Sequence, residues 1–166
     1  EPQQLRGTKV RVMKSRMAMD MVSTMGGAPT PIAFGELYTA LQQGMVDGAE
    51  NNPPSLLSSR HYEVARHYSL DEHSRVPDMV IFSQTVWATL SAQERGWLEQ
   101  AAADSVVFQR ELWTVKSDEA LATIEAAGVT IYRPDKAPFV AATAPLYEQY
   151  RDTMIGDLAE RVRRVK

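Results

Sequence analysis

The sequence contains no cysteine, and this absence removes several kinds of function at once. A chain without thiols has no disulfide framework, no thiolate nucleophile and no cysteine-ligated metal ion. Its three histidines, His61, His67 and His73, also lack the i, i+4 spacing of a helical zinc pair. We therefore expect neither a metal site nor a cofactor, while the cellular compartment is left open.

Long apolar runs and a sustained basic face are missing as well. No stretch approaches the roughly 18 residues of a membrane-spanning helix, and no charged-then-apolar signal sequence opens the chain, so we expect a processed or truncated protein. The net charge is −3, and the C-terminal RVRRVK is too short for nucleic-acid binding, which must neutralise many phosphates. With 44% hydrophobic and 23% charged residues, the chain can bury a core.

Strand-like and helix-like patterns alternate in the first part of the chain. Two prolines favour extended backbone after the first helix, and the Pro53-Pro54 pair suits the start of a later one. The predicted elements are a strand at 9–13, a helix ending at Gly26, extended backbone at 28–33, a helix at 35–44, a strand at 46–50 and a helix from Pro53 through Tyr68. This order predicts an α/β sheet that binds ligands at the carboxyl ends of its strands.

Beyond Val76 the predicted elements become longer. PDMVIFS (77–83) is typical of a strand, and Ser91 with Glu94 has the S-x-x-E form of a capping box. No proline follows before Gly128, which predicts one helix of about 35 residues and roughly 50 Å. Such a helix is either part of a coiled coil or helix bundle, or it is a strut that connects two domains. The remaining predicted elements are a strand at 129–132 and helices at 138–150 and 158–165.

Arg11 is the first candidate binding residue, because it lies in the middle of KVRVM with a valine on each side. An arginine inside a sheet is costly unless it is paired, and its planar guanidinium matches a carboxylate through two parallel hydrogen bonds. The alternative is an arginine on an edge strand that reaches solvent or a structural acid. The residue pattern by itself favours that alternative.

Other polar and aromatic residues allow two interpretations each. Asn51 and Asn52 follow a predicted strand and could recognise hydroxyl and carbonyl groups, although asparagines more often serve turns and caps. Phe34 lines a pocket or, more commonly, packs in the core. Asp71-Glu72-His73 contains acid–base groups, but no nucleophile elbow or phosphate loop accompanies it. Catalysis therefore has weak support.

Three segments together resemble a known family. These segments are LRGTKVRVM, GGAPTPIAFGELYTALQQGMVDGAENNPPS and SSRHYEVARHYSLDEHSRVPD, and they resemble the solute-binding proteins of tripartite ATP-independent periplasmic (TRAP) transporters. The similarity runs through essentially the whole chain. It implies an α/β, type II periplasmic-binding-protein clamp of two domains that closes on a small organic acid and delivers it to a membrane permease. It implies a periplasmic binding protein, not an enzyme.

The resemblance also implies binding roles for individual residues. Arg11 stands at the place of the family's carboxylate-clamping arginine, so pairing with a ligand becomes the preferred interpretation. Asn51 matches a ligand-contacting asparagine, Phe34 an aromatic ring that lines the pocket, and His73 a histidine that some members place beside the ligand network. Lys14 departs from the polar amide of some sugar-acid binders and either meets a second carboxylate or turns to solvent. The expected ligand-binding residues are Arg11, Asn51, Phe34, Asn52, His73 and Lys14.

Family members have more chain before the point where this sequence begins, so the resemblance predicts a C-terminal portion. By analogy, residues 1–76 with 117–166 form the second domain, and 77–116 cross the hinge to complete the first. The full protein is expected to be a monomer, whereas this portion is expected to self-associate or to be poorly ordered around its exposed apolar residues.

Two other functional classes stay open beside the binding protein. A helix-mediated interaction module could be built on residues 92–127, and an α/β enzyme has less support. The resemblance also leaves the identity of the ligand open, because C4-dicarboxylates, sugar acids and 2-oxo acids all have a carboxylate that fits Arg11.

Overall fold

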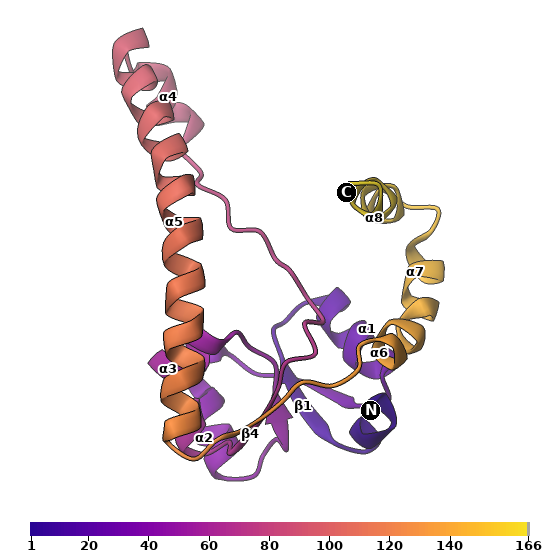
Figure 1. The fold of residues 1–166 in the computed structure, drawn as a ribbon. Helices are drawn as coiled ribbons and strands as arrows, with labels where there is room; N and C mark the ends of the chain where they lie inside the picture. The colour runs from indigo at the N-terminus through magenta and orange to yellow at the C-terminus, as the bar shows by residue number, and fades with distance from the viewer. Residues whose placement is uncertain (166) are drawn as a thin grey trace.

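The structure, a computed structural model, describes residues 1–165. A small α/β body carries two arms, one formed by the long helix α5 with α4 at its tip and the other by helices α6 to α8 (Figure 1). In chain order the elements are η1 (Pro2–Leu5), β1 (Lys9–Val12), α1 (Arg16–Thr24), β2 (Ala28–Pro31), η2 (Phe34–Glu36), α2 (Leu37–Gln42), β3 (Gly48–Ala49), α3 (Pro53–Ser58), η3 (His61–Glu63), β4 (His67–Ser69), α4 (Gln84–Thr89), α5 (Ala92–Ala126), β5 (Thr130–Tyr132), α6 (Ala137–Ala142), α7 (Ala144–Tyr150) and α8 (Met154–Arg163). The predicted α/β class is confirmed.

Two small parallel sheets form the centre of the body. In the first, β1 lies between β2 and β3, with Val12 opposite Pro31 and Arg11 opposite Ala49. In the second, β4 pairs with β5. Because parallel strands cannot be joined by a tight hairpin, α1 and α2 return the chain between the strands of the first sheet. The carboxyl ends of β1, β2 and β3 therefore meet at one edge.

Buried side chains form two clusters, one beside each sheet. The first holds α2 and the turn before β3, and the second holds α3, the end of α5 and the residue before β5. The buried members are Leu37, Ala40 and Val46 in the first cluster, and Leu56, Ile124 and Val129 in the second. Burial of apolar surface of this kind is the main term that holds the elements in place.

Helix α5 confirms the predicted continuous helix, with 35 residues. Its first turn is held by a capping box, in which the Ser91 Oγ accepts from the Glu94 amide while the Glu94 carboxylate accepts from the Ser91 amide. Only Ala120 and Ile124 are buried, and both lie in the C-terminal third, where α5 packs against α3. The rest of the helix projects away from the body (Figure 1).

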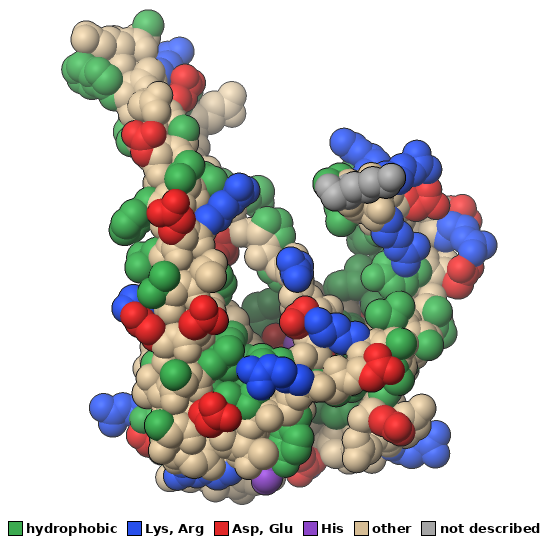
Figure 2. Space-filling model, viewed as in Figure 1, with side chains coloured by type: hydrophobic (Ala, Val, Ile, Leu, Met, Phe, Trp, Pro, Cys, Tyr) green, Lys and Arg blue, Asp and Glu red, His purple; other side chains and the backbone are tan. Residues whose placement is uncertain are grey.

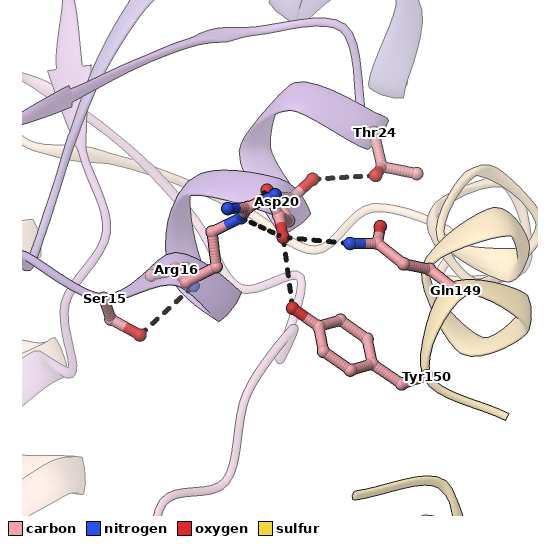
Figure 3. A network of polar contacts seen from close by, with 7 residues as sticks. Ser15, Arg16, Asp20, Thr24, Gln149 and Tyr150 are labelled. Carbon is pink, nitrogen blue, oxygen red and sulfur yellow. Dashed lines mark hydrogen bonds and ion pairs between the residues drawn. The ribbon is translucent and has the colours of Figure 1, made fainter. Parts of the chain in front are cut away.

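The second arm is tied to the body through the carboxylate of Asp20 on α1 (Figure 3). Arg16, one turn earlier, donates to it at 3.0 Å, and on α7 the Tyr150 hydroxyl and the Gln149 amide donate at 3.1 and 3.4 Å. Burial works against ionisation of Asp20, but these hydrogen bonds outweigh it and lower its pKa. Asp20 therefore joins segments that lie far apart in the sequence.

The predicted strand at 77–83 is wrong. Residues 70–83 contain no helix or strand and cross alone from the body to α4 (Figure 1). Their apolar side chains, such as Met79 at 80% and Ile81 at 85% exposure, are largely in solvent. A strand needs a partner for its backbone groups, and among residues 1–165 no other strand pairs with this segment.

Two helix predictions are also corrected. The helix from Pro53 ends at Ser58 and does not reach Tyr68, because Arg60 adopts a left-handed conformation (φ 56°, ψ 21°) that stops the helical ladder and leads into η3 and β4. The predicted helix at 138–150 is split at Thr143 into α6 and α7. Pro145 explains the break, since its ring nitrogen has no proton for the helical hydrogen bond.

Within 1–165, no helix combines the length and the apolar character needed to cross a bilayer.

Candidate ligand-binding site

Three of the predicted site residues gather at the carboxyl edge of the first sheet. Lys14 lies just beyond β1, Phe34 just beyond β2 and Asn51 just beyond β3. Because these strands are parallel and adjacent, the segments that follow them lie side by side. Edges of this kind are where open α/β sheets bind ligands.

Arg11 is buried in the central strand of this sheet, with 3% of its surface exposed. Its Nε donates to the Ile32 carbonyl oxygen at 2.9 Å, and its guanidinium carbon lies 5.8 Å from the centre of the Phe34 ring. No carboxylate among residues 1–165 forms an ion pair with it. The alternative of an edge-strand or structurally paired arginine therefore does not hold. A buried cation without a counter-ion is costly, which favours an anionic ligand.

The two asparagines share their side-chain oxygens with the local backbone. The Asn51 Oδ1 accepts from the Asn52 amide at 2.9 Å, and the Asn52 Oδ1 accepts from the Ser55 amide at the start of α3 at 2.9 Å. The Asn51 carbonyl oxygen accepts from the Tyr68 hydroxyl at 2.8 Å. The capping interpretation thus accounts for both oxygens. The side-chain NH₂ groups form no hydrogen bond within the described part of the chain and are left as donors.

His73 forms a charged cluster with two acids beside Asn51. Its Nδ1 lies 2.7 Å from the Asp71 carboxylate. Its Nε2 is buried, has no hydrogen-bond partner among residues 1–165, and lies 3.9 Å from the Glu50 carboxylate. The Asp71 hydrogen bond, and then the Glu50 carboxylate, outweigh burial and raise the pKa of His73 to about 9. At 3.9 Å Glu50 acts through its charge and not through a direct hydrogen bond.

The other two candidates differ in exposure. Lys14 is exposed and forms no ion pair or hydrogen bond within residues 1–165, so it turns to solvent at the sheet edge. Phe34 is 47% exposed, with Arg11 over its ring. The structure therefore places Phe34 at the rim of the site and not in the core.

His61 lies beside two of the candidate site residues, and the sequence did not identify it. It is buried, and its ring meets that of Phe34 in an edge-to-face contact with 5.6 Å between centroids. Burial, and then the charge of Arg11, lower its pKa. The left-handed turn at Arg60 brings His61 to this position, and no spacing in the sequence reveals such a turn.

Two hollows lie near the body. A cavity of about 270 Å³ between β3 and β4 is lined by Asn51, His61 and Tyr68 among others. A larger one, about 640 Å³, lies between α3 and α5 and contains none of the predicted site residues. Arg11 lines neither of these two hollows. In the space-filling view, open space separates the two arms above the body (Figure 2).

The His73 cluster predicts a pH-dependent stability. Because the folded-state pKa of His73 is about 9, above its ordinary value of 6.5, the cluster stabilises the fold fully below pH 6.5 and loses this contribution as the pH rises to 9. We expect the free energy of unfolding to fall by about 1 to 3 kcal/mol over that range. Urea unfolding of wild type and His73→Gln at pH 6.5 and 9.0 measures it as the difference between the two proteins. His67→Gln should retain the fall, and an equal fall in His73→Gln would contradict the assignment.

The chain belongs to the family of bacterial extracellular solute-binding proteins, family 7, whose pattern it matches over residues 1–153. A solute-binding protein of Chromohalobacter salexigens is 42% identical over 150 residues, which are 90% of this chain and 45% of the relative. The C4-dicarboxylate-binding periplasmic protein DctP of Rhodobacter capsulatus is 30% identical over 161 residues, or 97% of this chain and 47% of that protein. The chain spans about half the length of these relatives.

Solved structures give the same result. A TRAP periplasmic solute-binding protein from Pseudomonas putida F1 with bound D-glucuronate matches with a TM-score of 0.93 and 36% identity, over 100% of this chain and 54% of that one. A second, from Xanthobacter autotrophicus Py2 with bound β-D-galacturonate, matches with a TM-score of 0.92 and 37% identity, over 99% and 56%. The resemblance found in the sequence is thus confirmed.

Family membership bears on the enzyme alternative. The family consists of solute-binding proteins of transporters and not of enzymes, so the enzyme alternative is set aside. Its members are extracytoplasmic, periplasmic proteins, in agreement with the expected location.

Proposed function

We propose that this chain forms the Arg11 side of a clamp that binds a uronate, such as D-glucuronate or D-galacturonate. The single observation that carries the proposal is the buried side chain of Arg11, which lies in the central strand β1 without an acid partner among residues 1–165. Two close structural relatives contain bound uronates. A uronate offers one carboxylate for Arg11 and several hydroxyls for neutral donors and acceptors.

In this proposal, the surrounding residues contact different parts of the sugar. The ring of Phe34, exposed at the rim, supports the apolar face of the pyranose. The free NH₂ groups of Asn51 and Asn52 donate to ring hydroxyls. His73 pairs with Asp71 and lies near Glu50, and it thereby fixes the positions of these polar side chains beside the asparagines. Lys14 stays in solvent unless the ligand has a second carboxylate.

The complete clamp and its transporter are part of the same proposal. We assign residues 1–76 and 117–166 to the second domain, and 77–116 to the segment that crosses the hinge. Within that segment, Phe82, Trp97 and Phe108 are 50%, 63% and 65% exposed, which suits residues that pack against another domain. The protein would then work as a monomer that delivers the acid to a TRAP permease, and residues 1–166 by themselves would self-associate. The apolar α5 surface is used inside the clamp, and this disfavours the separate interaction module.

A matched set of ligands tests the proposal. The complete protein is titrated calorimetrically with D-glucuronate and D-galacturonate, with D-glucose and D-galactose as neutral counterparts, and with succinate and pyruvate. We expect the uronates to bind more than 100-fold tighter than the neutral sugars, since a buried unpaired charge costs several kcal/mol. Tighter binding of succinate or pyruvate would reject the uronate, and equal binding of glucose and glucuronate would reject Arg11 as the carboxylate site.

A further inference from the structure

Arg11, Phe34 and His61 form a continuous contact that links three separate segments of the body. The guanidinium carbon of Arg11 lies 5.8 Å from the centre of the Phe34 ring, and the edge-to-face contact of Phe34 with His61 has an interplanar angle of 75°. Aromatic pairs prefer this edge-to-face arrangement, and a cation prefers the face of a ring. Phe34 thus contacts a cation and a second ring at the same time.

His61 is buried, but its ring nitrogens have no hydrogen-bond partner in the described part of the chain. It is 3% exposed, and among residues 1–165 no hydrogen bond or ion pair involves its side chain. The residue before it, Arg60, is one of two non-glycine residues with a positive φ in the described chain, and this conformation costs about 1 kcal/mol or more. The backbone is therefore strained at Arg60, in the turn that places His61 next to Phe34.

The charges around His61 make its protonation sensitive to Arg11. The other ionisable side chains that line the same cavity are Asp47, Arg66, His67 and Tyr68. Asp47 accepts a hydrogen bond from the Lys9 amide, Arg66 donates to the Ala127 carbonyl oxygen, and the Tyr68 hydroxyl donates to the Asn51 carbonyl oxygen. On η3, Glu63 accepts from the Tyr38 hydroxyl. Burial lowers the pKa of His61, and the positive charge of Arg11 lowers it further.

We propose that His61 is a positioning residue of the Arg11 site: its ring packs against Phe34 and keeps it beside the guanidinium, and a carboxylate on Arg11 favours protonation of His61. This rests on the proposed function, because it requires an anionic ligand on Arg11. The carboxylate neutralises the field that keeps His61 unprotonated, so binding and protonation favour each other. Linkage then requires that the affinity rise as the pH falls through the range in which His61 titrates.

The experiment measures D-glucuronate affinity by calorimetry on the complete protein at pH 5.5 and 8.0, in two buffers of different ionisation enthalpy. For wild type we expect about three- to tenfold tighter binding at pH 5.5, with net uptake of protons. His61→Phe keeps an aromatic ring against Phe34 but cannot titrate, so its affinity ratio between the two pH values should be near one, with no proton uptake. His61→Ala removes the ring and should weaken binding at both pH values.

The other histidines provide the controls. The pKa of His73 is about 9, so His73 stays protonated across this pH range. His67, whose Nδ1 lies 3.1 Å from the Tyr132 hydroxyl, does not contact Phe34, and His67→Gln should retain the wild-type ratio. Loss of the pH dependence in His67→Gln, or its persistence in His61→Phe, would overturn the inference.

Failure of this inference is distinguishable from failure of the proposed function. If D-glucuronate does not bind wild type, or binds Arg11→Ala equally well, the uronate site on Arg11 is rejected and the role of His61 with it. If Arg11→Ala loses binding while wild type shows no proton uptake, the anion site stands and only the role of His61 is rejected.

Discussion

Replacing Arg11 with lysine is expected to weaken D-glucuronate binding to the complete protein by about 1.5 to 3 kcal/mol. Lysine keeps the positive charge but loses the planar pair of donors that matches a carboxylate. It also loses the Nε donor to the Ile32 carbonyl oxygen, so the head group is no longer fixed. Isothermal titration calorimetry measures the change, and the larger substitution Arg11→Ala should abolish detectable binding.

A matched control separates this effect from a general loss of charge. Arg75→Lys makes the same replacement at a residue whose side chain is 90% exposed. Its one ion pair, with the Glu72 carboxylate at 3.9 Å, is long and lies at the surface. Surface pairs of this kind contribute little, so ligand affinity should be unaffected. Unchanged affinity in Arg11→Ala, with an intact circular dichroism spectrum, would remove Arg11 from the binding site.

Replacing Ile124 with alanine should destabilise residues 1–166 by about 2 to 5 kcal/mol, the largest stability effect we expect from a single substitution. Ile124 is completely buried at the base of α5 and packs in a cluster with Leu56 and Val129. Because α5 contacts the body mainly through this end, the cavity left by the substitution weakens the attachment of the whole arm. Urea unfolding followed by circular dichroism measures the loss.

The control for this substitution lies on the same helix. Val107 is 61% exposed in this chain, so Val107→Ala removes little buried surface and should change the unfolding free energy by less than about 0.5 kcal/mol. A cost below about 1 kcal/mol for Ile124→Ala would show that the base of α5 is not the attachment point. A large cost for Val107→Ala in residues 1–166 would show that the chain covers this face by self-association.

Much of the fold could be predicted because local signals determine it. The valines around Arg11 produce a strand, the Ser91 and Glu94 pair starts α5, and the lack of proline keeps that helix continuous to Ala126. The strand at 77–83 failed for a non-local reason, because apolar residues become a strand only beside a partner. Strand β4 was missed because it has only three residues and two of them are polar.

The candidate site could be predicted to the same degree. The end of a predicted strand indicated Asn51, whereas Phe34 was assigned to the pocket only through the family resemblance. The capping role of Asn52 follows from its position before two prolines and is an ordinary property of asparagine. His61 could not be found in this way, because it reaches Phe34 only through the left-handed conformation of Arg60. Whether these residues contact a ligand stays a prediction.

The attachment of α5 at one end gives the helix a mechanical property. The stretch from Ala92 to Ala120 is about 42 Å long at about 1.5 Å per residue, and it is free of the body along most of that length. A rotation of about 5° at the base would move the tip by about 4 Å, although the packed residues at the base would shift by only a fraction of that distance. In the described part of the chain, helix α5 thus has the geometry of a long arm held at its base. If the packing around Ile124 and Leu56 changed slightly, the same geometry would turn that change into a much larger displacement of α4.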